Sequence, residues 1–244
     1  MNSIAAICAS VELQLRSVVL KGAERCTSCQ LLLRWCICAA RREVECPLQI
    51  DLLTHRREQL RPSSTGNLIH RTFTGSRQHL WAPDEPLREA DVVLPDRDLW
   101  VLHPSGRPAP AAIDASKVQI LLLDGSWSET ANMARQVASW GTRVSLPMSG
   151  ESRFWLRAKQ DGNRYSTAEA LLHVLALLGL SAAERELSLQ FELHVYASLR
   201  ARGQLGQAAA FLAGSPLRDG MTDFLAQLQT PRPLPAINAK AAPK

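Results

Sequence analysis

The chain has 244 residues, which is long enough for one complete hydrophobic core with a small appendage. Hydrophobic residues make up 46% and charged residues 21%, a composition that excludes a largely disordered chain. The formal net charge of +5 favours an anionic partner without demonstrating one. No apolar run approaches the roughly 18 residues of a membrane span, and the N-terminus lacks the basic start of a secretory signal, so we expect a soluble cytoplasmic protein.

The predicted elements begin with a small N-terminal part. Residues 1–22 have the pattern of a helix that ends near Gly22, and a cysteine-rich segment follows. We therefore divide the chain into residues 1–47 with this helix and the cysteine segment, residues 48–229 with the main domain, and residues 230–244, whose prolines predict a disordered tail.

Four of the six cysteines are close enough in the sequence to bind one metal ion. Their spacing predicts a closed tetrahedral zinc site with a structural role, because four thiolates leave no position for a reactive water. Buried free thiols, a redox pair and an iron–sulfur cluster are the alternatives, and Cys8 and Cys46 are expected to be ordinary small hydrophobic residues. The predicted ligands are Cys26, Cys29, Cys36 and Cys38.

Short apolar runs that alternate with helical patterns predict a mostly parallel sheet with helices on both faces. The predicted strands cover residues 50–53, 92–94, 99–102, 118–123 and 143–146. Three Ser-x-x-Glu patterns predict capping boxes at the starts of helices over residues 126–140, 167–178 and 181–202. Leu171, Leu172, Leu175 and Leu178 recur at helical spacing and are expected in the core.

Basic residues are concentrated between Arg41 and Arg77. This basic stripe suits an RNA backbone, although a solvated cationic surface is an equal alternative. Its candidate RNA-binding residues are His55, Arg56, Arg57, Arg61, Arg71 and Arg77.

The predicted strand over residues 118–123 ends in Asp124-Gly125-Ser126-Trp127, where the next helix begins. Ligands of open α/β sheets bind beyond the carboxyl ends of strands, so Asp124 is a candidate site residue. The alternative is that Asp124 only caps the helix. Trp127 can stack on a base, but a tryptophan in the first turn of an amphipathic helix is more often part of the core.

Several other short motifs lie on both sides of this turn in the sequence. They are His55-Arg56-Arg57-Glu58, Ser64-Thr65-Gly66, Val101-Leu102-His103-Pro104-Ser105, Arg157 and Tyr165-Ser166-Thr167-Ala168-Glu169-Ala170. Together with the cysteine loop and the Asp124 turn, their order resembles the DTW-domain family of tRNA-uridine aminocarboxypropyltransferases. Gly125 stands where that family has the threonine of its Asp-Thr-x-Trp motif.

The resemblance implies a SPOUT-like α/β fold, and the expectation of a knot near its C-terminus comes from the resemblance alone. It also implies transfer of the aminocarboxypropyl group from S-adenosylmethionine to uridine N3 of tRNA, in the variable loop. Asp124 is then the catalytic base or an orienter of the donor amine, and Arg157 contacts the donor carboxylate or a tRNA phosphate. The implied cofactor-binding residues are Pro104, Ser105, Gly125, Ser126, Trp127, Arg157, Ser166, Thr167 and Glu169.

Three other functions remain compatible with these residues. The same donor can methylate RNA if it binds in the reverse orientation, and a zinc-dependent protein can bind RNA without turnover. A redox-sensing thiol protein is the third. The oligomeric state cannot be inferred from the sequence.

Overall fold

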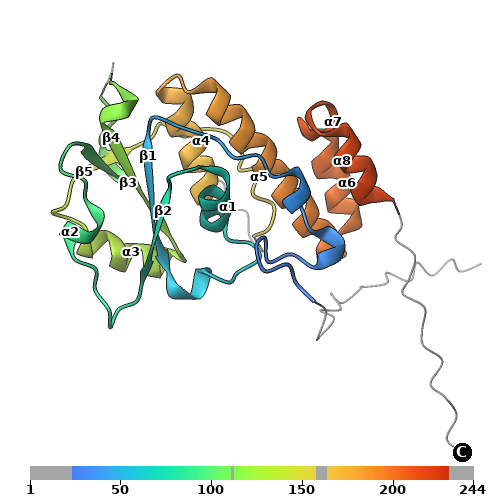
Figure 1. The fold of residues 1–244 in the computed structure, drawn as a ribbon, viewed down its shortest axis with the longest axis horizontal. Helices are drawn as coiled ribbons and strands as arrows, with labels where there is room; N and C mark the ends of the chain where they lie inside the picture. Colours follow the sequence, from blue (N-terminus) through green and yellow to red (C-terminus); the bar gives the residue numbers. More distant parts are fainter. Residues whose placement is uncertain (1–23, 111–112, 158–163, 231–244) are drawn as a thin grey trace, which may run out of the picture.

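The computed structural model describes residues 24–110, 113–157 and 164–230. Its centre is a five-stranded parallel sheet in the order β2-β1-β4-β3-β5 (Figure 1). The predicted α/β class, with a parallel sheet between helices and a small cysteine-containing N-terminal part, is confirmed, while the knot stays a prediction. The strands are β1 (Gln49–His55), β2 (Arg77–Trp81), β3 (Asp98–Pro108), β4 (Val118–Asp124) and β5 (Thr142–Ser145).

Alternate side chains of the strands pack against two different helical layers. Ile50 of β1 and Ile120 of β4 belong to the larger core, and the buried leucines of α4 complete it. Leu53 and Leu121 point to the opposite face, where they pack with Met133 of α3. The larger layer contains α1 (Thr65–Thr72), α4 (Thr167–Leu177) and α5 (Ser181–Ala201); the smaller contains α2 (Glu89–Val92) and α3 (Trp127–Gln136).

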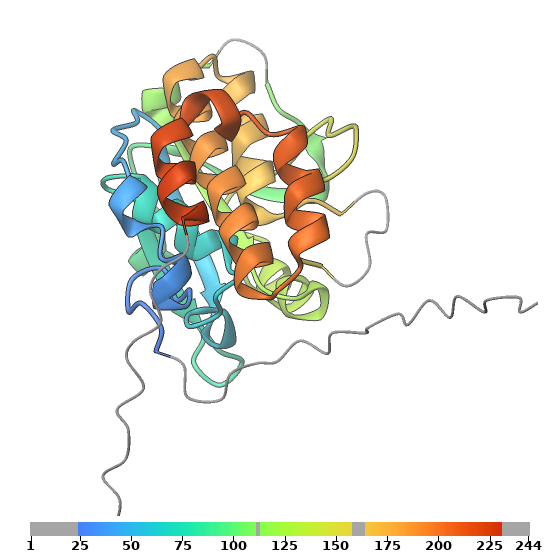
Figure 2. The same ribbon diagram turned by 90° about the vertical axis from the view of Figure 1, so that its right-hand side faces the viewer.

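The C-terminal part of the described chain is helical. α6 (Leu205–Ala213), α7 (Leu217–Gly220) and α8 (Thr222–Gln229) lie beside α5, on the side away from the sheet (Figures 1 and 2). Phe211, Leu217, Leu225 and Leu228 are buried in the larger core. These helices are therefore integral to the fold.

The segment predicted as a strand over residues 92–94 is not one. Val92 ends α2, and its carbonyl oxygen accepts hydrogen bonds from the Arg77 and Gln119 side chains at 2.6 and 2.9 Å. The Gln119 side chain also accepts from the Leu94 amide at 2.9 Å. The backbone groups that a strand would pair with a neighbour are thus occupied by side chains of β2 and β4.

Two of the three predicted capping boxes form. At α3 the Ser126 amide donates to Glu129 at 2.7 Å, and at α4 Ser166 and Glu169 bond reciprocally. At α5 the prediction was wrong, because the helix begins with Leu180 as its N-cap and has no side-chain cap. The helix predicted over residues 1–22 and nearly all of the predicted tail lie outside the described residues. None of the helices in the described ranges is long and apolar enough to cross a membrane.

Candidate functional site

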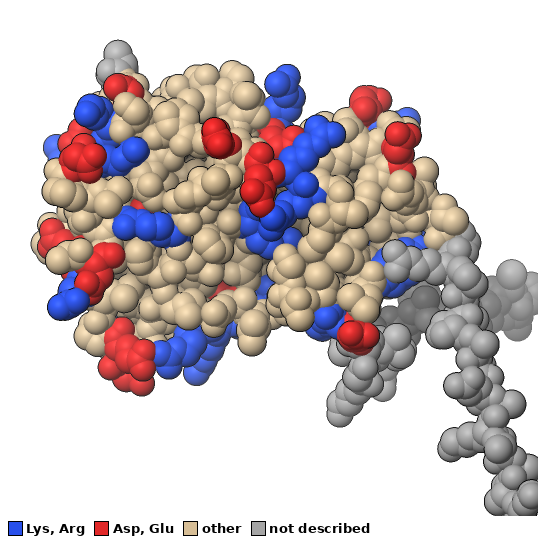
Figure 3. Space-filling model, in the orientation of Figure 1, with Lys and Arg blue, Asp and Glu red and all other residues tan. Residues whose placement is uncertain are grey.

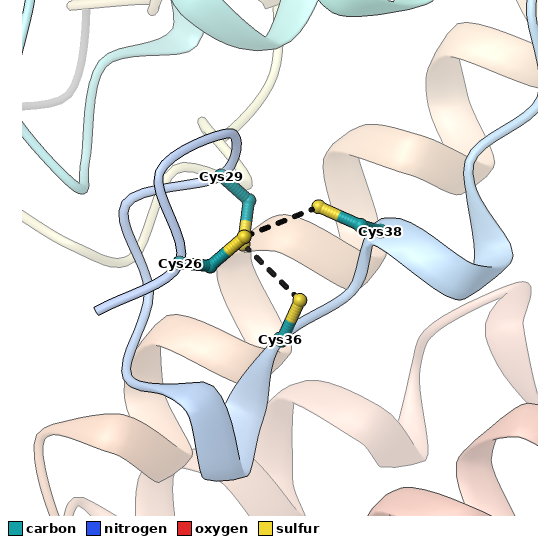
Figure 4. A group of neighbouring side chains, drawn as sticks. All are labelled: Cys26, Cys29, Cys36 and Cys38. Atoms are coloured by element: carbon teal, nitrogen blue, oxygen red, sulfur yellow. Dashed lines mark hydrogen bonds between the residues drawn. The ribbon is translucent and has the colours of Figure 1, made fainter. Parts of the chain in front are cut away.

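The four cysteines of the predicted metal site converge. Their sulfur atoms all lie within 4.8 Å of one another (Figure 4). Cys26 and Cys38 are 3.6 Å apart and Cys29 and Cys36 are 3.8 Å apart, measured between sulfurs. Tetrahedral Zn–S bonds of about 2.3 Å place sulfurs about 3.8 Å apart, so the cluster has the size and the donor set to hold such an ion.

The protein environment acts differently on these thiols. The Cys29 backbone amide lowers the pKa of the Cys26 thiol to about 6. Burial raises the pKa of Cys29, and raises that of Cys36 to about 12. A cation at the centre of the cluster would favour the thiolate at every position, which is the form that coordinates metal. Cys46, expected to be a small hydrophobic residue, packs half-buried against the core.

The second site is built around Asp124, the last residue of β4. The side chain is only 5% exposed. Ser64 donates to its Oδ2 at 3.0 Å, and Thr167 donates to its Oδ1 at 2.8 Å. Ser64 is the N-cap of α1 and Thr167 is the first residue of α4, so the carboxylate lies where one strand end meets the starts of two helices. Asp124 does not serve as the N-cap of α3, because that position is held by Ser126.

Gly66 makes the approach of α1 to this carboxylate possible. Its backbone amide hydrogen-bonds to Asp124. A Cβ atom at position 66 would lie 2.4 Å from Asp124 Oδ2, closer than any ordinary contact. Only glycine lets the first turn of α1 come this near to the carboxylate, which explains why residue 66 is a glycine.

Burial raises the pKa of the Asp124 carboxyl, against the lowering effect of its three hydrogen bonds. Glu58 is also buried, and burial raises its pKa as well. His55 Nδ1 lies 3.4 Å from Glu129 Oε1. The repulsion of Glu58 by the charges of Asp124 and Glu129 shows that the three carboxyl groups share one neighbourhood.

Trp127 is not part of the core. Its side chain is 56% exposed, and the Arg164 guanidinium carbon lies 5.5 Å from the ring centroid. Ser126 is exposed as well. A Cβ atom at Gly125 would come within 3.1 Å of Glu129 Cβ and 3.2 Å of Met133 Cε, so the packing of α3 leaves little room for a threonine there.

Arg157 and Glu169 both bond to the segment at the start of α4. Arg157 donates to the backbone oxygens of Arg164 and Tyr165, the latter at 2.9 Å, and so holds the chain just before α4. Glu169 is buried and accepts from Ser166 and from Ser152. In this structure these predicted cofactor contacts support the start of α4.

Pro104 and Ser105 lie at an irregular part of β3. The strand shifts its register against β5 between Leu102 and Arg107, and both residues are exposed. The Ser105 hydroxyl is 2.8 Å from His103 Nδ1. In the described part of the chain no hydrogen bond joins either residue to Asp124, so their role toward a donor stays a prediction that depends on their place at the carboxyl end of the sheet.

The basic stripe separates into two groups. Arg56, Arg57 and Arg61 are exposed and follow the end of β1, which runs beside the end of β4 through the pairing of Thr54 with Asp124. Arg77 instead donates to buried Asp51 at 2.7 Å, and Arg71 donates to the Asn67 carbonyl at 3.3 Å. On the face drawn in Figure 3, basic side chains occur in separate groups with acidic ones beside them. Arg56 and Arg61 are themselves paired with Glu85 and Glu58, so these arginines differ from Arg77 in their exposure and not in being unpaired.

Four residues of the site were not among the predicted catalytic or cofactor residues. They are Ser64, Gly66, Glu58 and Glu129. Ser64 and Gly66 belong to the Ser64-Thr65-Gly66 motif and Glu58 to the His55-Arg56-Arg57-Glu58 motif, and the capping box predicted Glu129 at the start of its helix. Burial of Glu58 leaves no mark in the sequence.

Comparison with known proteins identifies the chain's relatives. No solved structure matches it. The family model described as the DTW domain matches residues 23–199, a range that includes the cysteine cluster, Asp124 and the start of α4. The chain therefore belongs to the DTW-domain family.

Proposed function

We propose that this protein transfers the 3-amino-3-carboxypropyl group of S-adenosylmethionine to N3 of a uridine in tRNA, in the variable loop. Family membership supports a role in tRNA modification. The observation that carries the proposal is Asp124, a buried carboxyl with a raised pKa at the meeting point of β4, α1 and α4. The reaction takes place in the cytoplasm, and the four cysteines hold a structural zinc ion.

In the proposed reaction, uridine N3 attacks the methylene carbon of the donor next to sulfur. The N3–carbon bond forms, the carbon–sulfur bond breaks, and its electron pair neutralises the sulfonium as methylthioadenosine leaves. The N3 proton passes to Asp124. A carboxyl whose pKa is raised toward the working pH is a better proton acceptor than an ordinary aspartate, and three donors hold it in one orientation.

The surroundings of Asp124 provide contacts for both substrates. Trp127 offers an exposed ring on which a base of single-stranded tRNA can stack. Arg57 supplies positive charge for the phosphate backbone, and Arg56 and Arg61 do so by exchanging their pairs with Glu85 and Glu58 for phosphates. Loops at the carboxyl end of the sheet, with Pro104, Ser105 and Ser126, receive the donor, as ligands of open α/β sheets do.

The activity is tested by incubating the purified protein with tRNA and S-adenosylmethionine and measuring nucleosides by mass spectrometry. We expect uridine to gain the mass of an aminocarboxypropyl group and methylthioadenosine to appear in equal amount. A methyl increment would identify an RNA methyltransferase, and binding of tRNA without product would identify a non-catalytic RNA-binding protein.

The role of Asp124 is tested with Asp124→Asn, which keeps the shape of the side chain and removes its basicity. Loss of a general base reduces kcat by about 10²–10⁴-fold. Donor affinity, measured by calorimetry, should change little. If Asp124→Asn keeps wild-type kcat, Asp124 is not the base and the proton leaves by another route; weaker donor binding in that variant would assign it as an orienter of the donor amine.

A further inference from the structure

The C-terminal helices follow the part of the chain that the family model matches, yet they reach the segment that supports the Asp124 site. The match ends at residue 199, and α6 begins at Leu205. Figure 2 shows α6 beside α5 on the outer side of the molecule. The ring of Phe211, on α6, is fully buried and lies 5.3 Å from that of Trp155, centroid to centroid.

Arg153 connects α6 and α5 to the chain before α4. Its Nε and Nη2 donate to the two carboxylate oxygens of Glu192 at 2.8 and 2.6 Å. Nη2 also donates to the Phe211 carbonyl at 3.1 Å, and the guanidinium carbon lies 4.0 Å from the Phe211 ring centroid. A bidentate pair with a partner only 5% exposed fixes the guanidinium in one geometry.

The backbone of the same residue holds Glu169. The Arg153 amide donates to Glu169 Oε1 at 2.7 Å, and the Ser152 hydroxyl donates to the same carboxylate at 2.9 and 3.0 Å. On its other side, Glu169 Oε2 accepts from the Ser166 amide at 2.6 Å. The buried carboxylate therefore joins the chain at residues 152–153 to the first turn of α4.

The first residue of α4 completes the connection. Thr167 directly follows Ser166 and donates to Asp124 Oδ1 at 2.8 Å. A series of contacts thus leads from Phe211 through Arg153 and Glu169 to Ser166, and from its covalent neighbour Thr167 to Asp124. A displacement of a reacting group by 1 Å can reduce a rate by about 100-fold, so the position of Thr167 matters for the chemistry.

We propose that Arg153 is a positioning residue through which the C-terminal helices hold the Asp124 carboxyl in its reactive orientation. The inference rests on the proposed function. Arg153 contacts no reacting atom and acts through Glu169 and Thr167. The catalytic unit of this protein then includes α6, beyond the segment that defines its family.

Arg153→Gln tests this inference, with Arg218→Gln on α7 as the matched control because Arg218 is exposed. We expect kcat of Arg153→Gln to fall on the order of 10-fold to 100-fold, while KM for tRNA stays near the wild-type value. Arg218→Gln should leave both constants unchanged. A rise in KM for tRNA at constant kcat would overturn the inference and assign Arg153 to RNA binding.

A double-mutant cycle separates positioning from general destabilisation. If Arg153 acts through Thr167, then Arg153→Gln should slow the Thr167→Val protein no further, because the contact it supports has already been removed. If the loss of kcat in the double variant equals the product of the losses in the two single variants, the two residues act independently and the inference is wrong.

Hydrogen exchange provides a readout independent of turnover. Amides of residues 166–170 should exchange faster in Arg153→Gln than in the wild type, and Arg218→Gln should not change them. Should Arg153→Gln fail to fold, Phe211→Leu removes the ring that packs on the guanidinium and on Trp155 but leaves the Arg153–Glu192 pair, and a smaller acceleration in the same peptide is expected. Unchanged exchange overturns the inference, whereas absence of product from the wild type overturns only the proposed function.

Discussion

His194 lies in the middle of α5 and is 1% exposed. Within the described ranges, neither ring nitrogen has a hydrogen-bond partner. Burial, reinforced by the positive charges of Arg71 and Arg202, lowers its pKa from 6.5 to about 3. The folded protein therefore keeps this imidazole neutral at pH values where the unfolded chain would protonate it.

The consequence is acid sensitivity with a defined sign. Between pH 6.5 and about 3 the unfolded state binds the extra proton, so the free energy of unfolding falls as the pH decreases through this window. The slope from this group approaches about 1.4 kcal/mol per pH unit. We expect His194→Leu to lose less stability than the wild type on acidification, measured by urea unfolding at several pH values. If the free energy of unfolding falls equally with pH in the two proteins, His194 is not the source of this acid sensitivity.

Individual site residues differ in how far the sequence indicated them. Asp124 was predicted from its place between a strand and a helix, but the donors Ser64 and Gly66 belong to a different element and reach it only through the packing of α1 on the sheet. A tryptophan in the first turn of a helix is more often buried, but Trp127 is exposed. The first turn of a helix can face either way, and neighbouring elements decide which.

At the scale of elements, two helix starts with the same Ser-x-x-Glu pattern behave differently. Ser166 caps α4, and its hydroxyl accepts from the Glu169 amide at 3.3 Å. Ser181 lies within the first turn of α5, after an N-cap at Leu180 that forms no side-chain bond. The pattern alone therefore does not determine which serine caps a helix.

These two serines form a natural pair for a stability measurement. Ser166→Ala should lower the free energy of unfolding by about 1 kcal/mol, because it leaves the buried backbone amide of Glu169 without the hydroxyl that accepts its hydrogen bond. Ser181→Ala should change it by less than about 0.5 kcal/mol. Chemical denaturation measures both, and equal losses would show that the cap at α4 contributes nothing specific.

Element prediction failed twice where the usual signals were weak and once where a clear signal misled. β2 is an edge strand of mostly polar residues, with only Trp81 buried, so it lacks the apolar run of a central strand. α1 has Ser64 as its N-cap but Asn67 where a capping box would have a glutamate. The segment over residues 92–94 had the apolar run without the pairing, because Gln119 and Arg77 occupy its backbone groups.

At the scale of the whole molecule, the cysteine loop contacts both the main core and the end of the last described helix, α8. Cys29, Leu31 and Ile37 are buried in the main core. Arg34 donates to the carbonyl oxygens of Leu228 and Thr230 at 2.7 and 2.9 Å, at the end of α8. The loop and the C-terminal helices consequently support each other.

Removal of the proposed zinc ion should therefore affect more than the loop. Metal analysis of the purified protein should find one zinc ion per chain, and a chelator should lower Tm by roughly 6–12 °C, as expected for a loss of about 3 kcal/mol in a chain of this size. Amide exchange in α8 should accelerate along with that of the loop. An unchanged Tm after verified metal removal would show that the cysteines contribute no folding energy through a metal.

The sequence by itself determined the metal-binding potential of the cysteine loop, the α/β class and Asp124 as the acid of the strand-to-helix turn. These properties depend on spacing and periodicity over short stretches of chain. Only the tertiary structure brought Ser64, Gly66 and Thr167 to one carboxylate and joined Phe211 to it through Arg153. It also distinguished the exposed arginines at the end of β1 from Arg77, which is half-buried and bonded to the buried Asp51. Burial and long-range hydrogen bonds arise when distant segments pack together, so their effects on pKa and orientation are properties of the folded chain.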